Sequence, residues 1–228
     1  MKNKSKMKYY YALIGFLFLV IDTRIKAFAY PAYIPFDTPA PKTVDMIINH
    51  VVTDHMNIDI FSDIIGYILV LLSAFGFKKE DWSTHSIDPE IRGRRQTALV
   101  GIKKLIPWTI VALICCLATK LFPFFLNGSA RYCTGYLIFY VYTFLKAITM
   151  IYTIIICTGF LENIKDHMFI NTSTIFLLIG IGCYVVSAFV FFYDLGKTYY
   201  IYLGFAILFA LLGVIRIAVN VFQSPENQ

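Results

Sequence analysis

The chain has 228 residues, of which 58% are hydrophobic and only 15% are charged, and its mean hydropathy is +0.68. Soluble domains are about half apolar and about one quarter charged, so this composition excludes an ordinary soluble domain and indicates a polytopic membrane protein. The net charge of +6 does not indicate a nucleic-acid partner, because the basic residues gather in short segments beside apolar runs, where they set membrane orientation.

Six apolar stretches are long enough to cross a bilayer, for which about 20 residues suffice. The first follows a lysine-rich start and resembles a signal peptide, but no small-x-small cleavage site follows it, so we predict that it is retained. The sequence therefore predicts an all-α integral membrane helical bundle that forms one domain, residues 1–228. The predicted spans are residues 9–25, 59–77, 104–126, 134–158, 170–193 and 199–222.

Two polar segments separate the first three spans. The prolines of residues 27–43 exclude a regular helix, and Thr43–Met56 has an amphipathic pattern that predicts a segment lying on the membrane surface. Residues 27–57 are thus expected to form an external segment. Residues 78–103 form the most basic loop, which we place in the cytoplasm, and its Asp88-Pro-Glu sequence predicts the start of a helix.

The basic residues predict the orientation of the chain. If the N-terminus is cytoplasmic, thirteen basic residues lie in the cytoplasm and six lie outside. Cytoplasmic segments carry an excess of lysine and arginine in membrane proteins. We therefore predict a multi-pass protein of the cell membrane with both termini in the cytoplasm.

Two segments carry a family resemblance. Residues 11–25 form a glycine-containing apolar stretch that ends in Arg24-Ile, and the second span opens with Ser62-Asp-Ile-Ile-Gly-Tyr-Ile-Leu. Together they resemble a group of small bacterial integral membrane proteins with an Asp-rich "PDFIGYIL"-like motif at the start of the second helix. Serine and isoleucine replace the proline and phenylalanine of that motif here, and residues 27–57 separate the two segments. The resemblance covers residues 11–77 and implies a membrane location without a settled activity.

Four charged residues form a candidate polar or ion-pair site: Arg24, Asp59, Asp63 and Lys146. Asp59 and Asp63 are spaced i,i+4, so a helix would place both carboxylates on one face near its N-terminus, where the helix dipole favours them. Arg24 closes the first span and would meet them at the external face. The interpretation is either an interfacial salt bridge that fixes two helices or a cation or proton site.

Lys146 lies at the centre of the fourth span, where a lysine is costly unless it finds a partner or faces a polar cavity. The carboxylates of the other segments are expected nearer the membrane interfaces, at a different depth. Tyr140, Tyr142 and Thr143 on the same span would provide hydrogen-bonding groups around the ammonium.

No motif predicts a catalytic residue or a cofactor. His50 and Asp54 have the spacing of two metal ligands on a helix, but a site needs three or four, so we predict no metal site. The preferred function is non-enzymatic: movement of a solute or ion, or a subunit of a membrane assembly, with the lipid bilayer and a membrane protein as partners. The alternatives are an intramembrane enzyme acting on a lipid-soluble substrate and a partner-binding immunity or sensor protein.

Overall fold

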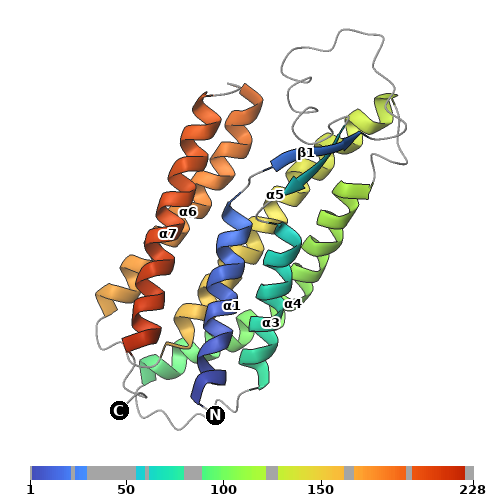
Figure 1. Ribbon diagram of the computed structural model, residues 1–228. Coiled ribbons are helices and arrows are strands. Elements are labelled where there is room, and N and C mark those ends of the chain that lie inside the picture. The colour runs from blue at the N-terminus through green and yellow to red at the C-terminus, as the bar shows by residue number, and fades with distance from the viewer. Residues whose placement is uncertain are drawn as a thin grey trace.

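The protein forms a helical bundle, seen in the computed structural model of Figure 1. The structure describes residues 2–21, 24–29, 55–59, 62–79, 89–121, 128–161, 167–193 and 197–223. The helices in these ranges are α1 (Lys2–Val20), α3 (Asp63–Lys79), α4 (Pro89–Leu121), α5 (Gly128–Gly159), α6 (His167–Tyr193) and α7 (Lys197–Gln223). They confirm the prediction of an all-α bundle, to which β1 (Arg24–Ala29) and β2 (His55–Asp59) add a short antiparallel ribbon.

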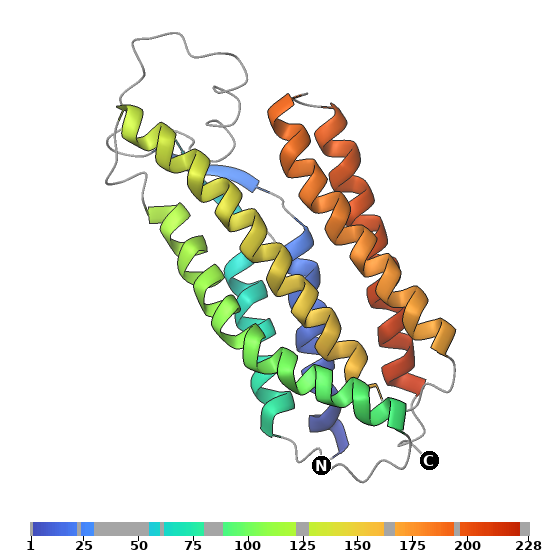
Figure 2. The same cartoon turned by 180° about the vertical axis from the view of Figure 1, so that it is seen from behind.

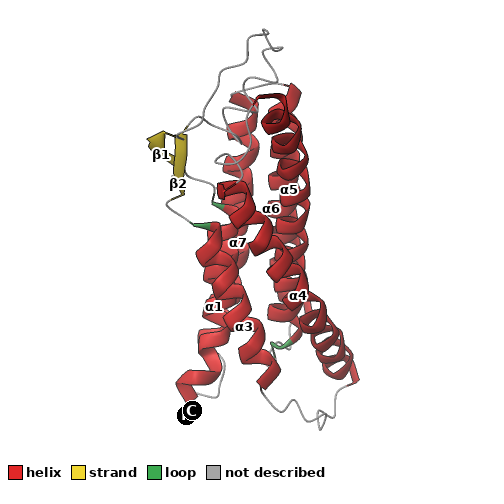
Figure 3. Ribbon diagram, turned by 90° about the vertical axis from the view of Figure 1, so that its right-hand side faces the viewer, coloured by secondary structure: helices red, strands yellow, loops and turns green. Residues whose placement is uncertain are grey.

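The helices pack in two groups. α3 lies between α1 and α4, and α4 packs along α5, whereas α6 and α7 pack mainly on each other. The α6–α7 pair joins the other helices through contacts of α7 with α1 and of α6 with α5. α1 begins and α7 ends at the same end of the bundle (Figure 1), and the ribbon lies at the opposite end (Figure 3).

Among the residues whose side chains the structure describes, three helical stretches are long and apolar enough to cross a membrane: Arg92–Thr119 in α4, Val141–Gly159 in α5 and Tyr200–Val221 in α7. Large apolar side chains also cover the outside of the bundle, and Ile114, for example, is 60% exposed. A surface of this kind is unfavourable in water and suits lipid chains. The fold is therefore that of a membrane protein.

Two boundaries predicted from the sequence are wrong. Arg24 lies in β1 rather than at the end of the first helix, and Asp59 lies in β2 rather than at the start of the second. The two residues are register partners in the ribbon, where the backbone groups that a helix would satisfy internally are paired across strands. α3 begins only at Asp63, after Ser62, whose carbonyl oxygen accepts the first helical hydrogen bond from the amide of Gly66 at 3.0 Å. Serine is favoured at this capping position.

The polar segments also differ from the expectation. Residues 43–54 of the predicted amphipathic segment lie outside the described residues, and His55 and Met56 at its end belong to β2. Much of the predicted loop at residues 78–103 is helical, because α4 begins at Pro89, as the Asp88-Pro-Glu signal indicated, and continues without a break. Proline is well suited to the first turn of a helix, where its missing N–H has no partner to lose.

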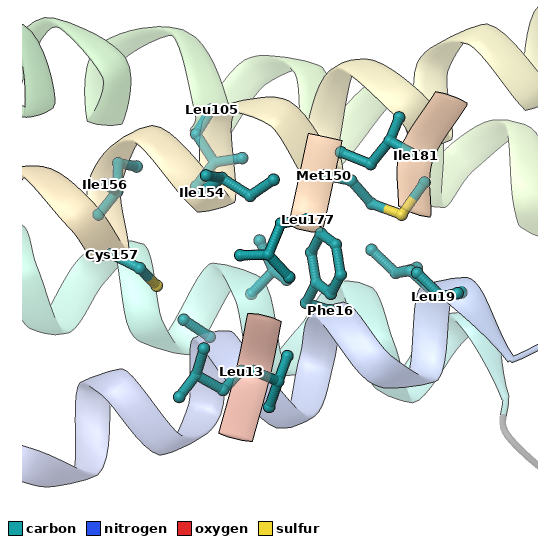
Figure 4. Packing of buried hydrophobic residues seen from close by; sticks show 14 of the residues in the cluster. Leu13, Phe16, Leu19, Leu105, Met150, Ile154, Ile156, Cys157, Leu177 and Ile181 are labelled. Carbon is teal, nitrogen blue, oxygen red and sulfur yellow. The ribbon is translucent and has the colours of Figure 1, made fainter. Parts of the chain in front are cut away.

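The core of the bundle lies between α1 and α5. Figure 4 shows Leu13 and Phe16 of α1 facing Met150 and Ile154 of α5, with Leu177 of α6 beside them. Each of these side chains is at most 4% exposed. This apolar packing fixes α5 against α1 and thereby sets the position of the polar residues that α5 carries.

Two glycines bring α1 and α3 into close contact. A Cβ atom on Gly15 would lie 2.9 Å from the carbonyl oxygen of Gly66, and a Cβ atom on Gly66 would lie 3.1 Å from the carbonyl oxygen of Gly15. The two backbones therefore touch where neither helix has a side chain, the arrangement by which small residues let membrane helices approach.

We expect Gly15→Ala to destabilise the protein by about 1–3 kcal/mol, the usual cost of overpacking, and to lower its melting temperature in detergent. Gly204→Ala on α7 is the matched control, because a Cβ atom there meets nothing within 4 Å. Alanine favours a helix over glycine, so this control should melt at the same temperature or slightly higher. Equal losses in the two variants would contradict the close contact.

Candidate functional site

A buried ion pair connects α3 with α5. The Nζ atom of Lys146 lies 2.7 Å from Oδ1 of Asp63, and the two side chains are 1% and 6% exposed. The hydroxyl of Tyr142 donates a hydrogen bond of 2.7 Å to the other carboxylate oxygen, Oδ2. Both oxygens of Asp63 thus have a close partner on α5, and contacts to a charged group are stronger than those between neutral groups.

The local sequence places these groups in two facing pairs. Asp63 and Tyr67 are separated by four residues on α3, and Tyr142 and Lys146 have the same spacing on α5, so each pair shares a helix face. The rings of Tyr67 and Tyr142 meet edge to face, with centroids 6.4 Å apart. Asp63 is the first residue of α3, where the positive end of the helix dipole stabilises a carboxylate.

α6 contributes a third side to the site. The ring of Tyr184 lies 5.1 Å from the Nζ atom of Lys146, closer than the ring of Tyr142 at 5.8 Å. Aromatic faces at this distance attract an ammonium group, and the attraction is stronger away from water. Lys146 therefore holds together three helices, α3 through Asp63, its own α5, and α6 through Tyr184.

The hydroxyl of Tyr67 is the unusual polar group of the site. Tyr67 is 0% exposed, and its hydroxyl interacts electrostatically with Asp63 and Lys146. Within the described part of the chain this oxygen makes no hydrogen bond, while Tyr142 donates its own proton to Asp63. A buried hydroxyl without a hydrogen-bond partner costs free energy, so the hydroxyl of Tyr67 does not stabilise the fold as that of Tyr142 does.

The ion pair lies within the apolar part of the bundle. At a rise of roughly 1.5 Å per residue, Asp63 is ~24 Å from the Lys79 end of α3 and Lys146 is ~20 Å from the Gly159 end of α5. A hydrocarbon layer is about 30 Å thick, so both groups lie inside it, toward the ribbon end. The sequence interpretation placed Lys146 at the centre of its span and the carboxylates at the external mouth. The expectation is wrong for Asp63, which lies at the level of Lys146 rather than at the external mouth, because its carboxylate contacts the Lys146 ammonium.

Of the four residues that the sequence singled out, the structure brings Asp63 and Lys146 into contact. Arg24 and Asp59 are paired with each other in the backbone register of the ribbon, and the structure describes only the backbone at these two positions. The sequence analysis named Tyr142 as a polar neighbour of Lys146 but missed Tyr184, for which the sequence does carry a signal. Its signal is a single tyrosine in the middle of an apolar helix, far from the interfaces where tyrosine usually lies.

No family model, curated protein or solved structure matches this chain. The functional conclusion is therefore based on the chemistry of the site. Within the described ranges no three histidine, cysteine, aspartate or glutamate side chains come together as a metal site, and His50 and Asp54 fall outside those ranges. What remains is a carboxylate that can exchange one positive charge for another, with Lys146 as its partner in this arrangement.

Proposed function

We propose that the protein moves a small cation, such as a proton, or a solute coupled to one, and that Asp63 and Lys146 form the coupling centre. The observation that carries this proposal is the ion pair of 2.7 Å between side chains that are 1% and 6% exposed. Removing two charges from water costs several kcal/mol per ion, and well-packed apolar residues are often at least as stable. An ion pair inside an apolar bundle is thus better suited to a function than to stability.

The mechanism rests on competition for Asp63. A proton or a cation that reaches the carboxylate neutralises it and removes the attraction that holds Lys146. The ammonium group then retains the ring of Tyr184 on α6, so the link between α3 and α5 weakens while the link between α5 and α6 persists. The closed pair corresponds to an occluded state, and its separation lets α3 move relative to α5 and α6.

The same proposal places the protein in a bacterial cell membrane with six spans and cytoplasmic termini. Its support is the excess of basic residues at the end where α1 begins, since Lys78 and Lys79 end α3 there and the basic first half of α4 starts there. Positive charge of this kind marks the cytoplasmic side. The resemblance of residues 11–77 to small bacterial membrane proteins agrees with this placement.

Proton flux into vesicles tests the proposal. We expect purified protein in vesicles that contain a pH-sensitive dye to acidify the interior faster than empty vesicles do when a potassium diffusion potential drives cations inward. The double variant Asp63→Asn/Lys146→Met should return the rate to that of empty vesicles, because it leaves no carboxylate to exchange a cation, whereas Gly204→Ala should keep the wild-type rate. Wild-type vesicles that match empty ones with protons, and with sodium under a sodium-sensitive dye, would refute the proposal.

One observation favours an intramembrane enzyme as a second candidate. A carboxylate, an amine and the hydroxyls of Tyr67 and Tyr142 converge in one buried place, and such groups can transfer protons to a bound substrate. For a lipid-soluble substrate the entrance would open toward the bilayer. If the wild-type protein shows no proton flux but converts a component of a lipid extract, and if Tyr67→Phe abolishes that conversion, the enzyme is favoured over transport.

A further inference from the structure

The surroundings of the Lys146 ammonium combine a carboxylate with aromatic rings. Its Nζ atom lies 2.7 Å from Oδ1 of Asp63, 5.1 Å from the ring centroid of Tyr184 and 5.8 Å from that of Tyr142. α5 lies between α4 and α6 (Figure 2), so Tyr184 approaches the ammonium from a different helix than Asp63 does. Aromatic faces within about 6 Å attract a cation, and proteins recognise ammonium ligands in this way. The structure thus holds an ammonium-binding place that is filled by a side chain of the protein itself.

The chemistry of this place distinguishes an organic ammonium ion from other cations. Calcium takes about 6–8 oxygen ligands and magnesium about six, whereas the faces of two aromatic rings form part of the walls here. A distance of 2.7 Å between Nζ and Oδ1 is that of a hydrogen bond between a charged donor and a carboxylate. A quaternary ammonium cannot form this hydrogen bond, because carbon atoms surround its nitrogen. The place is therefore suited to a primary ammonium.

Contacts that do not involve Lys146 hold the carboxylate and one of the rings. The hydroxyl of Tyr142 donates a hydrogen bond of 2.7 Å to Oδ2 of Asp63, and its ring meets that of Tyr67 edge to face. Lys146 is itself among the largest side chains that are fully buried. A shorter residue at this position would leave an enclosed space that has the shape of an alkylammonium ion and the same carboxylate at its end.

We propose that the coupling centre accepts a primary alkylammonium ion, the protonated form of an aliphatic amine, in the place of the Lys146 ammonium. The inference rests on the proposed function, in which a cation displaces Lys146 from Asp63, and it names the chemical class of such a cation. The incoming ammonium takes over the hydrogen bond to Oδ1, while Lys146 keeps the ring of Tyr184. No covalent bond changes and no proton is transferred, because the ligand enters and leaves as the charged ammonium.

The melting temperature in neutral detergent, followed against the concentration of n-propylammonium chloride, tests this proposal, since a ligand that binds only the folded protein raises it. Lys146→Ala removes the outer atoms of the side chain, which correspond to n-propylammonium. The tethered ammonium of the wild type competes with the ligand at a high effective concentration. We therefore expect half-saturation of Lys146→Ala at a concentration about tenfold or more below that of the wild type.

The matched control is Asp63→Asn/Lys146→Ala, which leaves the same space without the carboxylate and should show no saturable rise. n-Propanol, tetramethylammonium chloride and sodium chloride should have no saturable effect on Lys146→Ala, because each lacks either the charge or the N–H groups of the ligand. A rise as large with any of them would overturn the proposal, as would half-saturation of Lys146→Ala and the wild type at the same concentration.

The wild type decides the question if Lys146→Ala does not fold. It should show a saturable rise with n-propylammonium and none with n-propanol, and the absence of that rise would overturn the proposal. Proton flux separates this result from the proposed function. Flux without ammonium binding would refute the alkylammonium ligand alone, whereas ammonium binding without proton or sodium flux would support the ligand and refute transport.

Discussion

Lys146→Met is expected to destabilise the protein by about 3–5 kcal/mol, the cost of leaving one charge of a buried ion pair without its partner. Asp63 is 5% exposed, so its carboxylate cannot recover this free energy from water. Methionine keeps most of the volume of the lysine side chain, which separates the loss of charge from the loss of packing. Unfolding in detergent, followed by melting temperature, measures the effect.

The double variant Asp63→Asn/Lys146→Met makes the measurement specific. It removes both charges, and we expect it to recover most of the stability lost in Lys146→Met, because buried ion pairs are often replaced by neutral groups at little cost. Lys103→Met is the matched control, since Lys103 is exposed on α4 and its loss should change stability little. A double variant as unstable as Lys146→Met alone would mean that the two charges do not compensate each other.

The helices could be predicted from the sequence, but the ribbon could not. Long apolar runs in the sequence predict α4, α5 and α7 by their length alone, and the Asp88-Pro-Glu signal predicts where α4 starts. β1 and β2, in contrast, are short and lie about 25 residues apart in the chain, and they pair with each other. The apolar run ends at Ile21, but the polar residues Asp22, Thr23 and Arg24 that follow are equally compatible with the last turn of a helix, so they did not reveal that the helix ends at Val20. Strand pairing over such a distance depends on tertiary context.

For a related reason, only part of the candidate site could be predicted from the sequence. Spacing within one helix is readable, so Asp63 with Tyr67 and Tyr142 with Lys146 could be recognised as residues that share a face. Contact between helices depends on the depth at which each helix starts, and a shift of one turn moves a side chain by about 5 Å. The prediction that the second helix starts at Asp59 placed the carboxylates of Asp59 and Asp63 nearer the external interface than Lys146. Once α3 starts at Asp63, the carboxylate and the ammonium reach the same level.

Tyr142→Phe and Tyr67→Phe are expected to have opposite consequences, although each removes one hydroxyl from the same site. Tyr142 donates to Oδ2 of Asp63 at 2.7 Å, and losing a buried hydrogen bond to a charged group costs about 1.5–3 kcal/mol. The hydroxyl of Tyr67 is buried without a hydrogen-bond partner in the described part of the chain. Its removal should leave the melting temperature unchanged or raise it, because an unsatisfied polar group is lost.

Each tyrosine is the control for the other, because both rings stay in place and keep their edge-to-face contact. Equal destabilisation would show that Tyr67 has a hydrogen bond that stabilises the folded protein, and the distinction between the two hydroxyls would fail. If Tyr67→Phe is as stable as the wild type but loses cation flux, the hydroxyl contributes to the movement of the ion rather than to the fold. A stable Tyr67→Phe variant with full flux would instead restrict the coupling centre to Asp63, Tyr142 and Lys146.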